Sequence, residues 1–371
     1  MSQLFQPLDL GPLRLENRII VAPMCQYSAQ DGSATDWHMM HLGSLALSGA
    51  GLLILEATGV SPEARITYRD LGLYSDENEA ALAQVLAAIR IHAEIPVAIQ
   101  LAHAGRKASS LPPWEGGAQI PAEAPGGWRT VSASALPHGE GEEPPVALDE
   151  AGLEKIKADF VASAERAVRL GIDGIEIHCA HGYLLHQFLS PISNKRNDAY
   201  GGGREGRMRF PLEVFDAVRA AVPADRPVWV RISASDWVEG GWDVEDSVAL
   251  TKELAARGAA AIHVSSGGVS TQQKIALGPG YQVAFAEQVK AETGLPTIAV
   301  GLITEPAQAE EIIASGRADA IALARALLYN PRWPWHAAAE LGAQVRAPQQ
   351  YWRSQPRELK DLFLGARTGQ R

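Results

Sequence analysis

Short apolar, β-branched runs alternate along the chain with longer segments in which apolar residues recur with a helical period. Most of the short runs are apolar on both faces, which is typical of strands buried in a parallel sheet. The predicted strands cover residues 18–22, 52–56, 97–101, 174–178, 228–232, 261–264, 297–300 and 320–323. The predicted helices between them cover residues 77–92, 148–170, 207–221, 244–257, 282–293 and 306–315.

This alternation of eight strands with helical segments predicts an α/β fold, a (β/α)8 TIM barrel. A doubly wound open sheet is the alternative, but it usually has fewer strands and a nucleotide-binding turn after the first one. Here the first predicted strand is followed by Pro-Met-Cys-Gln-Tyr at residues 23–27, without a glycine fingerprint. We therefore predict one barrel domain over residues 1–371.

Two stretches break the alternation. Residues 109–147 are rich in Pro, Gly and Ser and contain Trp114 and Trp128. They follow the third strand, so we expect a lid or capping insertion at the C-terminal face of the barrel, with a passive surface excursion as the alternative. Residues 343–371 mix Pro, Arg and aromatic residues without periodicity, and we expect a C-terminal arm there.

Composition and charge exclude several classes of protein. The chain has 33 Lys and Arg against 43 Asp and Glu, a formal charge of −10, and no basic cluster that would bind nucleic acid. No apolar run approaches the roughly 20 residues of a membrane helix, and we expect no signal peptide. The two cysteines, Cys25 and Cys179, cannot ligate an all-cysteine iron–sulfur cluster, which needs four thiolates, and we expect a reducing cytoplasm.

Polar or reactive side chains follow nearly every predicted strand, where barrel enzymes place their active sites. The most specific segment is residues 178–183, with the sequence His-Cys-Ala-His-Gly-Tyr. Two imidazole N–H groups at His178 and His181 can stabilise negative charge on one substrate oxygen, and Tyr183 can donate a proton. A zinc site and a structural histidine pair are the alternatives.

Two further strand-end side chains require a particular environment. Arg231 ends an otherwise apolar strand, so its charge needs either a ligand with negative charge or an ion pair with Glu56 or Glu176. Cys25 lies beside Tyr27 after the first strand, where it is either part of the site or a buried bystander thiol.

The last two strands end in a pattern that fits a phosphate. Gly301 follows the seventh strand, and Ala324 and Arg325 follow the eighth, which is where this fold usually binds phosphate groups. The segment 201–206 also matches G-x-G-x-x-G, but no strand precedes it, and we interpret it as a loop before a helix at Arg207.

Taken together, these motifs resemble the old yellow enzyme family of flavin-dependent ene reductases, in its xenobiotic-reductase and thermophilic-like branch. The resemblance runs from about residue 4 to residue 353. It is carried by segments 17–18, 22–27, 100–107, 178–183, 193–202, 300–301 and 324–325. Leu302 departs from some relatives, which have tryptophan there, and Ala324-Arg325 stands where Gly-Arg is common.

The resemblance implies one noncovalent FMN at the C-terminal face, with NADPH or NADH as reductant. It implies that the flavin ring is lined by Pro23, Met24, Cys25, Ala57 and Gln100, that its N1–C2=O edge faces Arg231, and that its phosphate is held by Gly301, Ala324 and Arg325. Cys25 is then a redox tuner and not a covalent nucleophile.

The resemblance also implies the activity: ping-pong reduction of the C=C bond of α,β-unsaturated carbonyl or nitro compounds by hydride from flavin N5. His178 and His181 would bind the substrate oxygen, Tyr27 would contact the same ligand, and Tyr183 would protonate the carbon. Arg353 would reach a neighbouring subunit's site in a homodimer or homotetramer. Other FMN barrels, a non-catalytic flavin- or phospholigand-binding barrel and a metal-dependent hydrolase are the alternatives.

Overall fold

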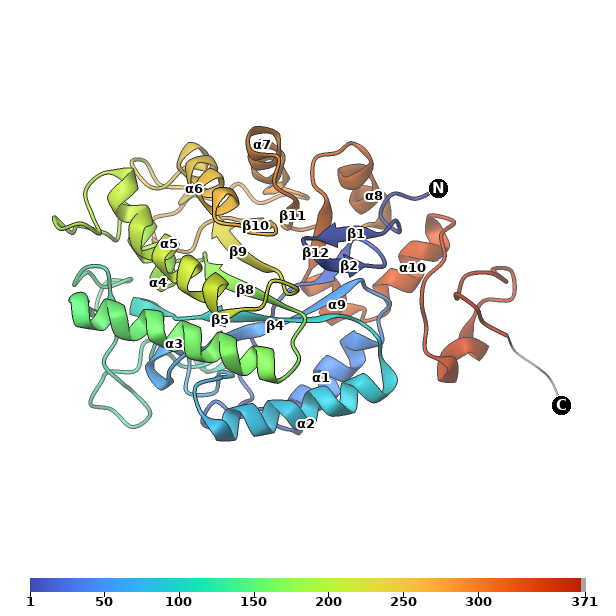
Figure 1. Cartoon of the computed structure of the whole chain (residues 1–371), viewed down its shortest axis with the longest axis horizontal. Coiled ribbons are helices and arrows are strands. Elements are labelled where there is room, and N and C mark those ends of the chain that lie inside the picture. Colours follow the sequence, from blue (N-terminus) through green and yellow to red (C-terminus); the bar gives the residue numbers. More distant parts are fainter. Residues whose placement is uncertain (368–371) are drawn as a thin grey trace.

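The fold is a closed barrel of eight parallel strands with helices on its outside (Figure 1). The structure, a computed structural model, describes residues 1–367. Around the barrel the strands run in the order β10, β11, β12, β3, β4, β5, β8 and β9. Their bounds are β3 (Ile19–Val21), β4 (Leu52–Gly59), β5 (Val97–Ala102), β8 (Gly174–Cys179), β9 (Val228–Ser233), β10 (Ile262–Ser265), β11 (Thr297–Ala299) and β12 (Ala320–Leu323). The predicted (β/α)8 barrel is confirmed, and every predicted strand is present.

The helices cover the apolar outer face of the strands. Their bounds are α1 (Asp36–Ala46), α2 (Asp76–His92), α3 (Glu150–Arg169), α4 (Leu184–Leu189), α5 (Arg204–Ala221), α6 (Val244–Ala256), α7 (Val283–Thr293), α8 (Pro306–Ala314), α9 (Arg325–Tyr329) and α10 (Trp333–Glu340). Asp149 and Asp243 cap α3 and α6 by accepting from the N–H groups of Gly152 and Asp246. Helix α5 begins at Arg204, so the interpretation of residues 204–206 as loop was wrong.

A small hairpin closes the N-terminal end of the barrel. Strands β1 (Leu8–Leu10) and β2 (Leu13–Leu15) pair antiparallel, and the inward side chains Leu10 and Leu15 are fully buried. They join an apolar cluster inside the barrel with Ile20, Leu52 and Ile298 among others. This end of the barrel is therefore packed shut, and only the opposite end is left to accept a ligand.

The insertion at residues 109–147 folds over the C-terminal end of the barrel. It contains the short helix η3 (Pro113–Glu115) and a parallel pair of strands, β6 (Val131–Ser132) and β7 (Val146–Ala147). Its main chain accepts hydrogen bonds from Arg106, which lies in η2 (Gly105–Lys107) just after β5. The Trp128 indole donates to the carbonyl of Glu63 in η1 (Pro62–Ala64) at 3.0 Å.

The C-terminal arm lies at the other end of the barrel (Figure 1). Arg346 forms ion pairs with Glu16 and Glu94, which precede strands β3 and β5. Beyond Arg346 the arm forms η4 (Gln349–Ser354) and a small apolar cluster that includes Val345 and Phe363. Residues 368–371 of the predicted arm lie outside the described residues. None of the helices within residues 1–367 combines the length and apolar character needed to cross a membrane.

Candidate active site

Three aromatic rings meet just beyond strand β8. His178 lies within the strand, whereas His181 and Tyr183 lie in the turn between β8 and α4. The centroid of the His178 ring is 5.0 Å from that of His181 and 4.9 Å from that of Tyr183. His178 is buried, and the other two rings are partly exposed at the open end of the barrel. The predicted trio is therefore assembled at one place.

Hydrogen bonds define where the protons of the histidines lie. His178 Nδ1 accepts the N–H of Ala180 at 3.2 Å, so the proton of a neutral ring is on Nε2. That Nε2 lies 3.3 Å from Nδ1 of His181, whose Nε2 lies 2.8 Å from the Ser265 hydroxyl oxygen. Burial, reinforced by Arg231, lowers the pKa of both rings well below the ordinary value. Both histidines are therefore neutral at physiological pH.

Tyr183 is held as a protonated phenol. Burial raises the pKa of its hydroxyl well above the ordinary value. The Lys107 ammonium lies 5.1 Å from the centre of its ring and donates to the carbonyls of His181 and Gly268 at 2.8 and 3.1 Å. Burial lowers the pKa of Lys107 to about 8. Lys107 thus links the turn after β8 to the loop after β10.

A buried carboxylate organises the floor of the site. Glu176 accepts hydrogen bonds from Gln100 Nε2 at 2.6 Å, Trp229 Nε1 at 2.7 Å and His263 Nδ1 at 2.7 Å. Burial alone would raise the pKa of Glu176, but His263, Arg231 and Trp229 outweigh it and lower the pKa to about 2. Because the Gln100 amide N–H is committed to Glu176, the orientation of its carbonyl oxygen is set.

Arg231 forms no close ion pair with any of residues 1–367, although Glu176 influences it at longer range. Its Nε atom is buried without a hydrogen-bond partner, and no carboxylate of residues 1–367 lies within 4.0 Å of its guanidinium. The alternative ion pair with Glu56 or Glu176 is therefore wrong. An unpaired buried cation is costly, which favours a ligand that carries negative charge at this position.

The segment after β3 forms one wall of the site. Glu56 accepts the N–H of Gln26 at 2.9 Å, and Tyr27 adopts a left-handed φ of 50°. The pairing of β4 with β5 shifts register between Leu55 and Ala57, which leaves Glu56 free for this contact. Burial, with Asp70 and Glu56, raises the pKa of the Cys25 thiol well above the ordinary value, so the thiol stays protonated.

The ends of β11 and β12 lie side by side and form a cradle. Gly301 has a φ of +114°, and a Cβ atom there would lie 2.7 Å from Gln282 Nε2, so only glycine fits. Ala324 directly precedes helix α9, which begins with Arg325. Backbone N–H groups and a guanidinium at such a place are suited to a phosphate.

Two residues of the sequence motifs lie elsewhere. Arg353 is exposed in η4 on the arm, whose Arg346 pairs with Glu16 and Glu94 ahead of strands β3 and β5. Cys179 packs with Ile177 and Leu185 in the apolar layer outside the barrel, so it does not join the histidines. Within residues 1–367, no group of three or more His, Cys, Asp or Glu side chains is arranged to hold a metal ion.

Sequence reasoning did not predict three contacts of the site. Ser265 contacts His181, Glu176 anchors Gln100, and Lys107 bridges two loops. Ser265 ends the buried strand β10, and Lys107 lies in η2 soon after β5, which was the available signal. The role of Glu176 depends on three contacts to other strands, and no local pattern shows it.

As a set, the residues fit a planar ligand that has a polar edge and a phosphate. Pro23 and Met24, just after β3, are partly buried, Ala57 of β4 is buried, and Gln100 of β5 and Arg231 of β9 are buried polar groups. The unpartnered Nε of Arg231 and the glycine-only cradle at Gly301 are the two observations that such a ligand explains.

Comparisons with known proteins identify this ligand. Residues 3–344 match the model of the NADH:flavin oxidoreductase / NADH oxidase family. The chain is 44% identical over 352 residues to the NADPH dehydrogenase of Geobacillus thermodenitrificans, which covers 94% of this chain and 98% of that protein. Morphinone reductase in complex with tetrahydroNAD superimposes with a TM-score of 0.75 and 30% identity, covering 94% of this chain and 93% of that one.

A third comparison concerns the fold alone. The chain superimposes on 2-naphthoyl-CoA reductase with a TM-score of 0.81 and 23% identity, covering 92% of this chain but only 52% of the larger protein. The family match, the relatives and the site geometry agree. The chain belongs to the NADH:flavin oxidoreductase family, the old yellow enzymes, and is an oxidoreductase that uses FMN with NAD(P)H as its reductant.

Proposed function

We propose that this oxidoreductase reduces the activated C=C bond of α,β-unsaturated carbonyl or nitro compounds. The observation that carries the proposal is the convergence of two neutral imidazoles and one protonated phenol at the open end of the barrel. Neutral donors stabilise charge that develops on an oxygen, and a phenol can supply a proton to the neighbouring carbon. When bound, FMN accepts hydride from NAD(P)H and supplies it to the substrate's β-carbon.

His178 and His181 bind the carbonyl or nitro oxygen in this proposal. His178 already presents Nε2–H toward the point between the two rings. The Ser265 hydroxyl donates to the Ile232 carbonyl at 3.0 Å, so without a ligand His181 Nε2 donates to Ser265 and His181 Nδ1 accepts from His178 Nε2. His181 presents a second N–H to the substrate oxygen when its proton moves to Nδ1 and the Ser265 hydroxyl turns to its Nε2. Tyr27 lines the same space from the opposite wall, next to Trp114 of the insertion, with ring centroids 5.6 Å apart.

The cofactor is held by three groups of residues. Pro23, Met24, Cys25 and Ala57 line its ring, with Cys25 as an uncharged thiol. Gln100, oriented by Glu176, and Arg231 bind its polar edge, where the guanidinium stabilises negative charge. Gly301, Ala324 and Arg325 bind the phosphate through backbone N–H groups and one cation.

The Tyr183→Phe variant tests the proton donor. We expect anaerobic reoxidation of the reduced enzyme by 2-cyclohexenone to slow by about 10²- to 10⁴-fold, the usual contribution of a general acid. Reduction by NADPH needs no such proton and should change by less than about threefold. Stopped-flow absorbance measures both half-reactions separately.

Tyr200→Phe is the matched control, because the Tyr200 hydroxyl contacts Glu213 outside the site. Both half-reactions should be unchanged in that variant. Equal slowing of the two half-reactions in Tyr183→Phe would remove Tyr183 from the role of proton donor.

We further propose that residues 109–147 act as a cap over the substrate and that Arg353 completes the site of a neighbouring subunit in a homodimer or homotetramer. Arg353 is exposed in η4 on the arm, which is consistent with a contact to another copy. Arg353→Ala should raise the KM for the enone about fivefold, the equivalent of about 1 kcal/mol for one charged contact. Sedimentation shows whether the variant remains assembled, and an unaltered KM in an intact dimer would contradict the shared site.

A further inference from the structure

Gly182 joins His181 to Tyr183, and side chains of helix α4 hold the peptide groups on both sides of it. Its N–H, in the His181–Gly182 peptide, donates to His186 Nδ1 at 2.8 Å, and its carbonyl, in the Gly182–Tyr183 peptide, accepts from Gln187 Nε2 at 2.7 Å. His186 and Gln187 are both fully buried. One short helix therefore holds the two peptide groups whose rotation would move the neighbouring rings.

Position 182 requires glycine, and the conformational freedom of glycine must be restricted by other contacts. Gly182 has a φ of +75°, and a Cβ atom there would lie 2.1 Å from the carbonyl oxygen of Gly268. No other residue fits against that loop. Glycine is also the residue with the widest choice of φ and ψ, so the backbone alone does not fix the rings that flank it.

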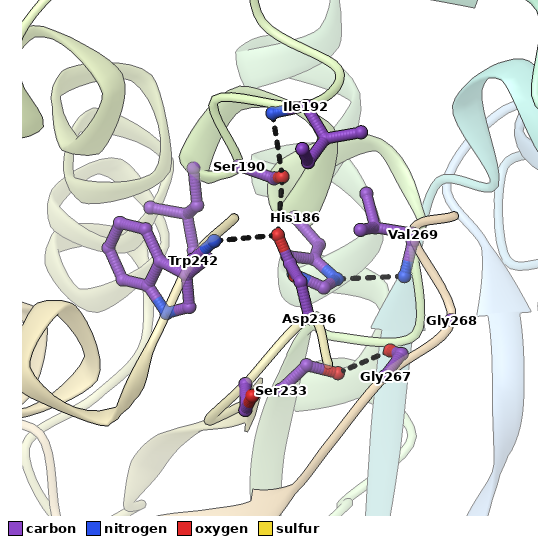
Figure 2. Close-up of polar contacts among 12 residues, drawn as sticks. His186, Ser190, Ile192, Ser233, Asp236, Trp242, Gly267, Gly268 and Val269 are labelled. Carbon is purple, nitrogen blue, oxygen red and sulfur yellow. Dashed lines mark hydrogen bonds and ion pairs between the residues drawn. The ribbon is translucent and has the colours of Figure 1, made fainter. Parts of the chain in front are cut away.

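A buried carboxylate stands behind His186 (Figure 2). Asp236 Oδ1 lies 2.8 Å from His186 Nε2, and Oδ2 accepts the Ser190 hydroxyl at 2.6 Å and the Trp242 N–H at 2.7 Å. Because His186 Nδ1 accepts from Gly182, a neutral ring carries its proton on Nε2, where Asp236 accepts it. Asp236 thereby selects the tautomer that leaves Nδ1 free to bind Gly182.

We propose that His186, backed by Asp236, is a positioning residue that clamps the Gly182 peptide and thereby orients Tyr183 for proton donation. The inference rests on the proposed function of Tyr183. The hydrogen bonds of His186 run to the Gly182 N–H and to Asp236 and not to the ring of His181 or Tyr183, so we propose that it acts through the backbone. A displacement of about 1 Å in a reacting group can cost on the order of 100-fold in rate. A contact that fixes this peptide can therefore affect the rate of the reaction.

Two substitutions separate the contacts of the clamp. His186→Asn keeps an amide oxygen near the position of Nδ1, so it can still accept from Gly182, but it does not reach Asp236. His186→Gln reaches toward Asp236 but leaves the Gly182 N–H without its acceptor. Both variants lose one buried hydrogen bond, so a merely structural role would affect them alike.

The experiment measures both half-reactions and the hydrogen exchange of the Gly182 amide in the FMN-loaded variants. We expect His186→Gln to slow enone reoxidation about 10- to 100-fold and leave NADPH reduction within about threefold of the parent. Its Gly182 amide should exchange faster. His186→Asn should keep reoxidation and Gly182 protection close to the parent values.

Three results would overturn the clamp: equal reoxidation rates in the two variants, equal slowing of both half-reactions in His186→Gln, or unchanged Gly182 exchange in that variant. If the parent enzyme itself fails to reduce enones, the proposed function falls separately. The clamp is then judged by amide exchange alone, which must be faster in the Gln variant than in the Asn variant.

Discussion

The two ends of the barrel bury different kinds of side chain. At the N-terminal end, the interior is filled by Leu10, Leu15, Ile20 and Ile298 beneath the β1–β2 hairpin. At the C-terminal end, strands β8, β9 and β10 bury ionisable groups, including Glu176, Arg231, His178 and His263. Trp229 joins the halves, because its ring packs in the apolar cluster and its Nε1 donates to Glu176.

The difference separates stability from function. Apolar packing at the closed end stabilises the fold through burial and close contact. Charges at the open end are costly to bury, and within residues 1–367 the Nε of Arg231 has no hydrogen-bond partner. We infer that apolar packing at the closed end offsets the cost of burying charges at the open end. The open end can then hold polar groups that gain a partner only when a ligand is bound.

Leu10→Ala breaks the apolar end and should have the largest effect on stability. Leu10 is fully buried in the β1–β2 hairpin, and removing it should lower the free energy of unfolding by about 2–5 kcal/mol. FMN affinity and both half-reactions should change little, because the hairpin closes the opposite end of the barrel from the site. Urea unfolding and a flavin titration measure the two quantities. A loss of FMN affinity as large as the loss of stability would contradict the separation.

Arg231→Met breaks the polar end and should show the reverse pattern. FMN affinity should fall about 10- to 100-fold, as expected for loss of a charge-assisted contact. The FMN-free protein should be as stable as the parent or more so, because an unpaired buried cation is removed. Fluorescence titration of FMN and unfolding of the apoprotein test this. A destabilised apoprotein with normal FMN affinity would show that Arg231 serves the fold instead.

Asp70→Asn tests the cost of burying an ionisable group through the pH dependence of stability. Burial, together with Glu56, raises the pKa of Asp70 from 3.8 to about 7 in the folded protein. The folded state therefore binds more protons than the unfolded state across this range, and the parent loses stability as the pH rises through it. The Asn side chain cannot ionise, so the variant should lose less stability than the parent as the pH rises. Unfolding of both proteins at several pH values measures the difference, and parallel curves would contradict it.

Much of the fold was predictable from local pattern. All eight barrel strands appear as short runs, most of them apolar on both faces, and Gly171, Gly258, Gly294 and Gly316 mark helix ends with positive φ. Helix α4 was missed because its six residues are buried all round and show no amphipathic period. The β1–β2 hairpin was missed because its role is to close the barrel, which only the assembled fold displays.

The site was predictable where chemistry sits at a strand end, as with His178 and Arg231. It was not predictable where a contact joins distant segments. His186 and Asp236 lie 50 residues apart, and Glu176 meets His263 across 87 residues. Such pairs are defined by the barrel's geometry, which brings the ends of neighbouring strands together.

The most direct test of the central claim is the visible absorbance spectrum of the purified enzyme, recorded before and after anaerobic addition of NADPH and then of 2-cyclohexenone. The account predicts a flavin spectrum that bleaches with NADPH and returns with the enone. A flavin that bleaches and stays bleached after the enone is added would contradict the proposed reaction of the His178, His181 and Tyr183 site.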